Sequence, residues 1–296
     1  MGMRSKKNQE KEALFMTEAR SYTMGNGSSA PIKDLVIAIK GAGEMATGVA
    51  CRLFKSNIRN IFMLETGHPL AVRRTVSFCE AVFGDAVSVE NVTARKAADK
   101  YRVPFIWQNN EIPVLVDPGW TAITAIQPHV VIDAIIAKKN LGTTRKEAPL
   151  VIGLGPGFEA GKDVHLVIET NRGHDMGKII RKGPAAPNTG IPGDISGKTV
   201  ERVLRAPGSG TFHSDLRIGV LVKAGQTVGH VDDQPVVARI DGMIRGLIRN
   251  RTTLNKGLKI GDIDPRGVKA SYTSISEKAR AIGGAVLEAV LSEFNT

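Results

Sequence analysis

The stretch LVIAIKGAGEMA, residues 35–46, decides the fold of this chain. Its first five residues are apolar and include β-branched side chains, which predicts a buried strand at residues 35–39. The pattern Gly41-Ala-Gly43-Glu-Met-Ala46 follows, and apolar residues then recur at helical spacing from Met45 to Phe54. A strand, a glycine turn and a helix in this order predict the opening unit of an α/β domain.

Strands and helices continue to alternate after this unit. Further strands are predicted at residues 61–64, 86–89, 113–116 and 130–134. Helices are predicted between them at residues 70–83, 94–101 (with Thr93 as the N-cap) and 120–126. This alternation predicts a doubly wound, Rossmann-like and mostly parallel sheet with helices on both faces, in a domain of residues 34–182.

The next strand, at residues 150–154, leads into Gly155-Pro-Gly157, and another strand is predicted at residues 164–168. Only residues 158–163 lie between the glycine loop and that strand, whereas a parallel crossover needs about a dozen residues or more. We therefore expect the chain to turn back tightly, so that the second of these strands is antiparallel to the first. A second complete mononucleotide-binding half is not expected.

The second half of the chain predicts a small β domain. Residues 183–198 are dense in Gly, Pro, Asn and Ser, which is typical of a linker loop. Residues 199–266 hold a quasi-repeat, in which residues 206–212 echo residues 238–244, and the pattern resembles the barrel-sandwich fold of biotinyl and lipoyl carrier domains. Those carriers present a lysine at the turn that reads Asp232-Asp-Gln234-Pro here, so we expect a docking or scaffolding role.

The C-terminal segment, residues 267–296, predicts a helix. Ser274-Ile-Ser-Glu277 has the form of a capping box, and apolar residues recur at helical spacing after it. We expect this helix to pack back onto the α/β domain.

Composition limits the class of protein. The chain has 296 residues with a formal net charge of +11, which favours anionic partners, but Lys and Arg are scattered and do not form one run. Aromatic residues are only 5%, so the stacking platforms that bind single strands are scarce and nucleic acid is disfavoured. Cys51 and Cys79 lie in apolar patterns, which suits reduced buried thiols and offers no metal site.

The N-terminus is polar, and residues 1–33 are predicted to be a disordered tail. No run approaches the roughly 18 apolar residues that a spanning helix needs, and a secretory signal is not recognisable. We expect a cytoplasmic protein with no membrane partner.

Two groups of residues could carry chemistry, and the first surrounds the glycine turn. Gly41 and Gly43 would let the backbone approach a pyrophosphate at the helix N-terminus, where Glu44 and Met45 form the first turn. Glu65, which ends the second strand, could hold ribose hydroxyls. The alternative is a tight turn that binds no ligand.

Asp133 ends a central strand, where open α/β sheets bind ligands. It is therefore a further candidate for cofactor binding. Capping the following helix is an equally good explanation of this residue.

The second group lies within residues 150–177. Glu169 and His174 could act as a general acid and base pair, and Arg172 could hold an oxyanion or a phosphate. The predicted binding residues here also include Gly155, Gly157, Asp163 and His165. Local hydrogen bonds that fix an irregular loop are the alternative reading of each residue.

Several motifs, in order along the chain, resemble those of the selenium-dependent molybdenum hydroxylase accessory protein family. The middle segment also resembles the nucleotide-fold domain of xanthine dehydrogenase maturation factors. The motifs are Ile39-Lys-Gly-Ala-Gly-Glu-Met-Ala46, Phe62-Met-Leu-Glu-Thr66, Arg73-Arg-Thr-Val-Ser-Phe78 with Glu80-Ala81, Gly153-Leu-Gly-Pro-Gly-Phe158, Asp163-Val-His165 and Glu169-Thr-Asn-Arg-Gly-His174.

The resemblance implies a role in maturing a molybdenum hydroxylase, which would be the client enzyme. The ligand would be the molybdenum cofactor (molybdopterin) or a nucleotide such as NAD(P). Two alternatives stay open: an NAD(P)-dependent oxidoreductase that uses Gly41, Gly43 and Glu65, and a scaffold that binds no small molecule. Self-association as a homo-oligomer is also left open.

Overall fold

The computed structural model describes residues 31–295, so the predicted tail lies almost entirely outside the described residues. The chain forms two compact units. Unit 1 comprises the chain up to Gly67, Phe78–Asn188 and the segment from Ser276 onward, and unit 2 comprises His68–Ser77 and Thr189–Ile275. The fold is mixed α/β, with a large and mostly parallel central sheet, further antiparallel sheets and a C-terminal helix.

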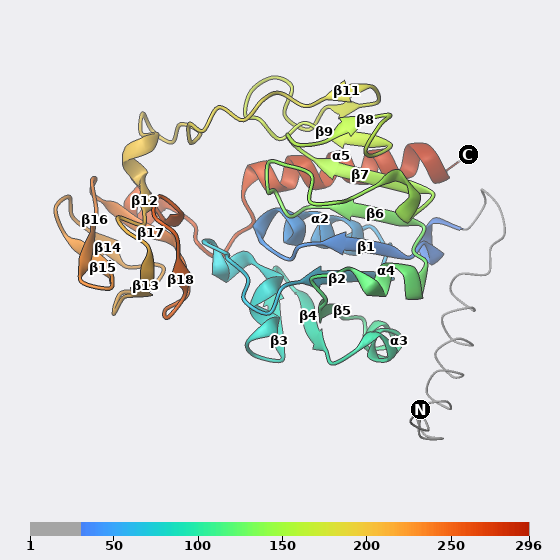
Figure 1. The fold of residues 1–296 in the computed structure, drawn as a ribbon, viewed down its shortest axis with the longest axis horizontal. Helices are drawn as coiled ribbons and strands as arrows, with labels where there is room; N and C mark the ends of the chain where they lie inside the picture. The colour runs from blue at the N-terminus through green and yellow to red at the C-terminus, as the bar shows by residue number, and fades with distance from the viewer. Residues whose placement is uncertain (1–30, 296) are drawn as a thin grey trace. The chain divides into compact units, whose positions relative to one another are not determined.

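The central sheet of unit 1 has the strand order β10-β9-β7-β6-β1-β2-β5-β4-β3 (Figure 1). Pairing is parallel from β9 through to β4 and antiparallel only at the two edges, between β9 and β10 and between β3 and β4. The strands are β1 (Ile37–Lys40), β2 (Ile61–Glu65), β3 (Ala86–Val89), β4 (Val92–Ala97), β5 (Ile112–Val116), β6 (Val130–Asp133), β7 (Leu150–Leu154), β9 (Leu166–Ile168) and β10 (Ile179–Ile180).

The chain changes direction across this sheet between β1 and β6. It runs from β1 to β2 and β5 on one side, and then returns to β6, β7 and β9 on the other. Lys40 and Asp133 are paired in register at the carboxyl ends of these two neighbouring strands. Open α/β sheets bind their ligands outside such a switch point.

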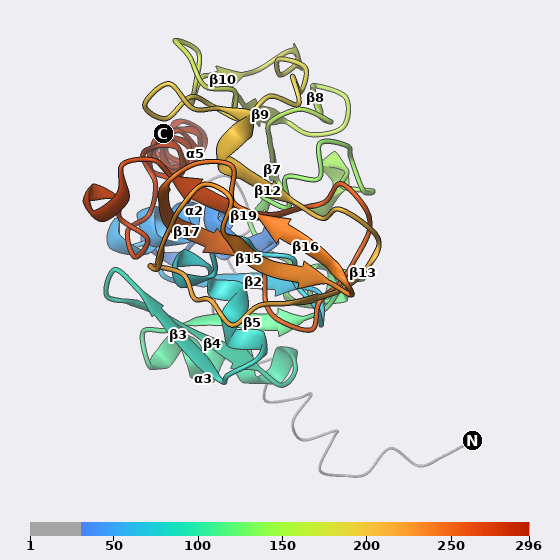
Figure 2. The ribbon, with the colours of Figure 1, turned by 90° about the vertical axis from the view of Figure 1, so that its left-hand side faces the viewer.

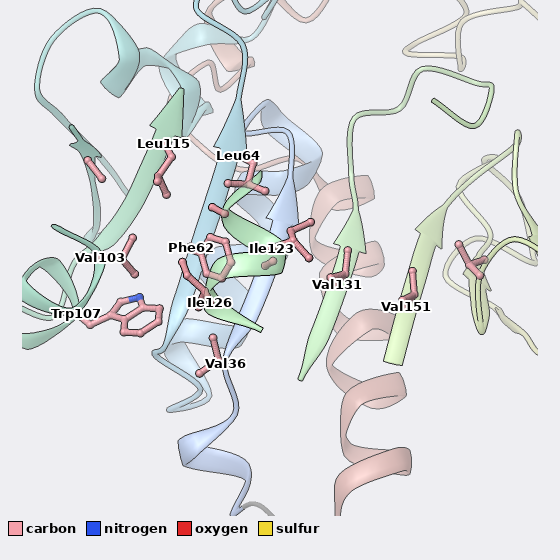
Figure 3. Packing of buried hydrophobic residues seen from close by; sticks show 14 of the residues in the cluster. Val36, Phe62, Leu64, Val103, Trp107, Leu115, Ile123, Ile126, Val131 and Val151 are labelled. Atoms are coloured by element: carbon pink, nitrogen blue, oxygen red, sulfur yellow. The ribbon is translucent and has the colours of Figure 1, made fainter. Parts of the chain in front are cut away.

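Helices cover both faces of the sheet. Helices α2 (Glu44–Lys55) and α5 (Glu277–Phe294) lie on one face, and the short helices α3 (Val103–Gln108) and α4 (Thr121–Ile126) lie on the other (Figure 1). Between the sheet and α3 and α4 is a buried apolar cluster that includes Phe62, Trp107 and Ile123 (Figure 3). The Trp107 indole N–H donates to the Ile61 carbonyl oxygen at 2.7 Å, so its one polar atom is satisfied.

Helices α2 and α5 pack closely and run parallel. A Cβ added to Gly48 would lie 2.8 Å from the Ala279 Cβ, and one added to Gly283 would lie 3.1 Å from the Arg52 Cβ. Because Gly48 and Arg52 follow one another along α2 as Ala279 and Gly283 do along α5, the two helices begin at the same end. Their N-termini therefore lie side by side.

Helix α5 begins two residues later than the predicted capping box implies. Ser276 is its N-cap, and the Ser276 hydroxyl accepts the backbone N–H of Ala279 at 3.3 Å. Ser274, the predicted cap, instead accepts a hydrogen bond from the Ser271 hydroxyl at 2.8 Å.

The helix predicted at residues 70–83 is wrong. This segment contains two short 3-10 helices, Arg74–Val76 and Phe78–Val82, and its first part belongs to unit 2. The Arg73 guanidinium donates to the Ser274 carbonyl oxygen at 3.0 Å and that of Arg74 to the Leu247 carbonyl oxygen at 2.8 Å. These long-range contacts override the local helical spacing of the apolar residues.

The helix predicted at residues 94–101 is also wrong, because Val92–Ala97 is strand β4. Strand β4 pairs with β3 through a turn at Glu90 and Asn91, whose φ angles are +48° and +65°. Two consecutive residues with positive φ form the tight turn that suits a two-residue hairpin. Residues 92–95 alternate between buried and partly exposed positions, as a strand requires.

The antiparallel excursion predicted after β7 is likewise wrong, since β9 pairs with β7 in parallel. The chain crosses over through residues 155–165, which include the short strand β8 (Glu159–Ala160) and no helix. Strand β8 pairs with β11 (Gly183–Pro184) outside the central sheet. This pairing places part of the predicted linker, residues 183–198, in regular structure.

Unit 2 contains two four-stranded sheets, whose strands can be followed in Figure 2. It has an apolar core of its own, in which Phe212, Ile244 and Ile263 are fully buried. One sheet has the order β12-β19-β17-β14 and the other β16-β15-β13-β18. The strands are β12 (Val203–Arg205), β13 (Gly210–His213), β14 (Leu221–Val222), β15 (Thr227–Val231), β16 (Gln234–Val237), β17 (Gly242–Leu247), β18 (Thr253–Leu254) and β19 (Lys259–Asp264). Single 3-10 turns elsewhere in the two units are Ile32–Asp34, Lys100–Arg102, Arg145–Glu147, Val200–Arg202 and Gly267–Lys269.

Candidate functional site

The glycine turn between β1 and α2 contains two glycines with different surroundings. Gly41 has φ +86°, and a Cβ there would lie 3.2 Å from the Ile135 Cα, so the packing of the chain itself requires glycine. Gly43 has φ −71° and ψ −173°, which any residue can adopt, and no atom lies within 4 Å of its Cβ position. The fold therefore demands Gly41 but leaves open space at Gly43, which is the N-cap of α2.

Glu65, at the end of β2, holds this turn. Its carboxylate accepts the backbone N–H of Ala42 at 2.8 Å and that of Thr66 at 2.8 Å. Burial raises the pKa of Glu65 above its usual value. The predicted ribose-binding residue thus lies beside the glycine turn, while Glu44 and Met45, both partly exposed, form the first turn of α2.

A buried polar network, which the sequence motifs do not reveal, lies directly before this turn. Lys40 is fully buried, and its ammonium donates to the Thr143 hydroxyl at 2.7 Å and pairs with the Glu147 carboxylate at 2.7 Å. The Thr143 hydroxyl in turn donates to the Asp133 carboxylate at 2.7 Å. Four residues from β1, β6 and the loop after β6 thus form one connected chain of hydrogen bonds.

The network carries opposite charges in a poorly hydrated position. The Lys40 ammonium also lies 3.6 Å from the centre of the Trp120 ring, in a cation–π arrangement. Burial lowers the pKa of Lys40 and raises that of Asp133. A signal for Lys40 was available, because it shares strand parity with Val36 and Ala38 and so had to point into the buried face.

Asp133 is buried at the start of the loop that follows β6, and its role in cofactor binding stays a prediction. Its side chain is 2% exposed, and its carboxylate accepts the Thr143 hydroxyl and the backbone N–H of Ile135. No helix follows β6, so the helix-capping alternative is wrong. Asp133 fixes the start of the loop that follows β6.

The second glycine loop, at Gly155 and Gly157, packs closely against the neighbouring loops. Gly155 has φ +77°, and its Cβ position is occupied by the Thr170 side chain. Gly157 has φ +109°, and a Cβ there would lie 2.6 Å from the backbone nitrogen of Lys139. The loops after β6, β7 and β9 therefore pack against one another at the carboxyl edge of the sheet.

Glu169 and His174 are not assembled as an acid and base pair. The buried Glu169 carboxylate accepts the backbone N–H of Asn171 at 2.6 Å and that of Ala186 at 2.7 Å. His174 is exposed on the following loop, and the described residues include no hydrogen bond between it and Glu169. The alternative of local hydrogen bonds that fix an irregular loop accounts for Glu169.

Asp163 and His165 lie at the opposite edge of the sheet from Glu169 and Arg172. The Asp163 carboxylate accepts the backbone N–H of Glu159 at 3.0 Å within a tight turn. His165 directly precedes β9, whereas Glu169 directly follows it, so the length of that strand separates them. The predicted cluster of these residues is therefore divided between two edges.

His165 shares its structural role with His129. The Nδ1 atom of His165 accepts the backbone N–H of Val151 at 2.9 Å, and Nδ1 of His129 accepts that of Val36 at 3.0 Å. Burial lowers the pKa of both imidazoles, and Arg145 lowers that of His165 further. Each neutral imidazole thus satisfies a backbone donor at the amino edge of the sheet.

This arrangement predicts that unit 1 loses stability in mild acid. Because the folded-state pKa values of His129 and His165 lie below the unfolded value of about 6.5, the unfolded chain binds more protons. The stabilisation is therefore complete above about pH 6.5 and is lost as the pH falls through the folded pKa values. Urea unfolding at a series of pH values should show this slope.

The matched variants are His129→Asn with His165→Asn, in which an amide oxygen can still accept the N–H without titrating. The double variant should flatten the slope, and His174→Asn, at an exposed histidine, should leave it unchanged. An unchanged slope in the double variant would show that these imidazoles do not cause the acid sensitivity.

Within residues 31–295, no group of three or more His, Cys, Asp or Glu side chains is arranged to hold a metal ion. In the same part of the chain, none of the helices has the length and apolar character needed to cross a membrane.

Comparison with known proteins gives one close relative in sequence. The chain is 47% identical over 263 residues to a protein of Escherichia coli (strain K12) described as uncharacterized protein YqeB. The match covers 89% of this chain but 48% of that protein, so the chain spans about half the length of the curated relative it matches. No family model matches the chain.

Solved structures give only remote similarity. An aspartoacylase family protein from Mesorhizobium loti is 12% identical, with 77% of this chain and 84% of that chain covered and a TM-score of 0.26. A succinylglutamate desuccinylase/aspartoacylase from Rhodobacter sphaeroides is 20% identical, with 22% of each chain covered and a TM-score of 0.20.

These comparisons overturn the family expected from the sequence motifs. No family model matches the chain, and YqeB, the relative found by sequence, is described as an uncharacterized protein and not as a molybdenum hydroxylase or xanthine dehydrogenase maturation factor. The expected membership of the selenium-dependent accessory family is wrong, and so is the maturation role inferred from it. The backbone angles and close contacts of Gly41, Gly155 and Gly157 account for most of the glycines in the motifs that suggested it.

Proposed function

We propose that unit 1 binds a nucleotide at the carboxyl edge of its central sheet, across the switch point between β1 and β6. The observation that carries this proposal is the open space at Gly43. Packing explains why residue 41 is glycine, but it gives no reason for glycine at residue 43. A phosphate seated against the backbone of the first turn of α2 would supply that reason.

The order of strands around β1 supports a Rossmann-like reading of this site. Strand β2 and then β5 follow β1 on one side, and β6 and then β7 follow on the other, as in sheets that bind dinucleotides. Glu65 ends β2, and its carboxylate could accept the ribose hydroxyls of an adenosine group placed there. We therefore propose NAD(P) or a related nucleotide as the ligand class.

The test is Gly43→Val. The ordinary backbone angles and empty surroundings of Gly43 predict that this variant folds, at a cost of about 1 kcal/mol because valine is a poorer N-cap than glycine. Its side chain would occupy the space of the phosphate, so nucleotide affinity should fall by at least about tenfold, or about 1.4 kcal/mol. Isothermal titration calorimetry with NAD(H), NADP(H) and ADP measures this directly.

Gly84→Val is the matched control. Gly84 also has no atom within 4 Å of its Cβ position, but it lies away from the glycine turn. This variant should bind nucleotide as the unchanged protein does. If Gly43→Val binds as tightly as Gly84→Val, or if the unchanged protein binds none of the nucleotides, the proposal fails.

For unit 2, the proposal is a barrel-sandwich-like module that docks a partner. Its support is the pair of four-stranded sheets together with the sequence echo between the segments of β13 and β17, which lie in different sheets. The turn at Asp232 and Asp233 joins β15 and β16 and carries no lysine that could be modified. The whole protein is proposed to act in the cytoplasm, where its two free, buried cysteines would stay reduced.

A further inference from the structure

Lys278, the second residue of α5, is a partly buried cation without an ion-pair partner among the described residues. It is only partly exposed, and among residues 31–295 it forms no hydrogen bond or ion pair. A lysine ammonium that loses water without gaining a partner is destabilised. An anion would stabilise it.

Two further cations lie near this ammonium. Arg172, on the loop after β9, pairs with Glu277 at 2.6 Å and so is held beside the first turn of α5. Lys138 is on the loop after β6, and the backbone of its neighbour Lys139 packs against Gly157. Burial lowers the pKa of Lys278 most, Arg172 and Lys138 lower it further, and Glu44 and Glu169 act in the opposite direction.

The nearby carboxylates do not serve as ion-pair partners of Lys278. Glu169 is engaged by two backbone N–H groups, and Glu277 by Arg172. The hydrogen bonds of these two carboxylates are therefore made with groups other than the Lys278 ammonium.

The backbone around Lys278 favours an anion as well. Helices α2 and α5 begin side by side, as their close crossing at Gly48 and Gly283 requires. The N-terminal ends of helices carry partial positive charge and backbone N–H groups. Two such ends add to the positive potential of the three side chains.

We propose that Lys138, Arg172 and Lys278 bind a phosphate group. The inference rests on the proposed function, because Lys138 and Arg172 lie on the loops after β6 and β9, at the same carboxyl edge of the sheet as the glycine turn. The phosphate could belong to the nucleotide bound at that turn or to a second, phosphorylated molecule. A dianion with several acceptor oxygens suits a set of two ammonium groups and a guanidinium.

The experiment uses the full chain with inorganic phosphate and pyrophosphate as probes. Lys278→Gln and Arg172→Gln should each weaken binding of these anions at least about tenfold in calorimetry. Arg181→Gln is the control. Arg181 pairs at 2.8 Å with Glu293, which lies on α5 but far from the N-terminus of that helix. It should bind the anions as the unchanged protein does.

A second measurement does not depend on any variant. Lys278, with its free amine, should react with an acylating reagent at mildly alkaline pH, and phosphate should slow this reaction at least about fivefold, as followed by mass spectrometry of peptides. The exposed Lys182 should react at the same rate with and without phosphate. Equal reaction of Lys278 in both conditions would overturn the proposal.

The source of the phosphate is decided by comparing ligands. If NADP⁺ or ADP competes with inorganic phosphate and the competition needs Lys278, the phosphate belongs to the nucleotide. If phosphate binding depends on Lys278 and Arg172 but no nucleotide binds, this inference stands and the proposed nucleotide function falls. If both variants bind phosphate and nucleotide like the Arg181→Gln control, this inference is wrong while the nucleotide proposal stands.

Discussion

Lys40→Met is expected to lower the free energy of unfolding of unit 1 by about 3 kcal/mol at neutral pH. Lys40 is fully buried and joins β1 to Thr143 and Glu147 on the loop after β6. Removal of its charge leaves the carboxylates of Glu147 and Asp133 without a cation in a poorly hydrated place. The loss of a single partner from a buried pair costs far more than the loss of an exposed pair.

Urea unfolding of matched variants measures this loss. Lys162→Met removes an exposed lysine that pairs with Glu159 at 3.2 Å, and it should lower the stability far less than Lys40→Met does. Adding Asp133→Asn to Lys40→Met should recover part of the lost stability, because it removes the stranded negative charge. If Lys40→Met lowers the free energy of unfolding no more than Lys162→Met does, the hydrogen bonds of Lys40 do not stabilise the loop after β6.

The pH dependence of this loss has a definite sign. Burial raises the pKa of Asp133, and removal of the nearby Lys40 charge should raise it further. The folded variant then takes up a proton more readily than the unfolded chain as the pH falls. The difference in stability between Lys40→Met and the unchanged protein should therefore shrink in acid.

Gly157→Ala is expected to destabilise unit 1 by about 3 kcal/mol, the second large effect. Gly157 has φ +109°, where a side chain is strained, and its Cβ would lie 2.6 Å from the backbone nitrogen and Cα of Lys139. A backbone cannot turn away as a flexible side chain can. The loops after β6 and β7 must separate, and Lys138 moves with the first of them.

Gly161→Ala is the control for backbone strain without a steric clash of the added Cβ. Gly161 has φ +86° but no atom within 4 Å of its Cβ position, so its substitution should cost about 1 kcal/mol. Thermal or urea unfolding gives the stabilities, and calorimetry should show that only Gly157→Ala also loses phosphate affinity. Equal effects of the two substitutions on stability would mean that the packing between the two loops is loose.

The sequence predicted much of unit 1 because its strands are strongly apolar and its first turn is rich in glycine. Strands β1, β2, β3, β5, β6 and β7 and helices α2 and α4 lie where the patterns place them, within a few residues. The helix predicted at residues 94–101 failed because the hairpin turn at Glu90 and Asn91 lacks glycine, which is the usual signal for positive φ. Without a turn signal, the spacing of the apolar residues in this segment was compatible with either a strand or a helix.

The candidate site was only partly predictable. Gly41, Gly43 and Glu65 were found because a glycine turn between a strand and a helix is visible in a few consecutive residues. Thr143, Glu147 and Lys278 were missed because each depends for its role on charged residues about a hundred or more positions away in the chain. Nothing in the sequence near Lys278 signals that α5 begins beside α2.

The sequence by itself determined the alternation of strands and helices, the glycine turn and the apolar faces, since each depends on side chains a few residues apart. Only the tertiary structure decided which edge of the sheet each loop joins. As a result, Asp163 and His165 accept backbone hydrogen bonds, whereas Lys40 is a fully buried cation and Lys278 a partly buried one. The reason is physical: solvent access and the distance between charges depend on how distant segments pack, and a local pattern does not specify either.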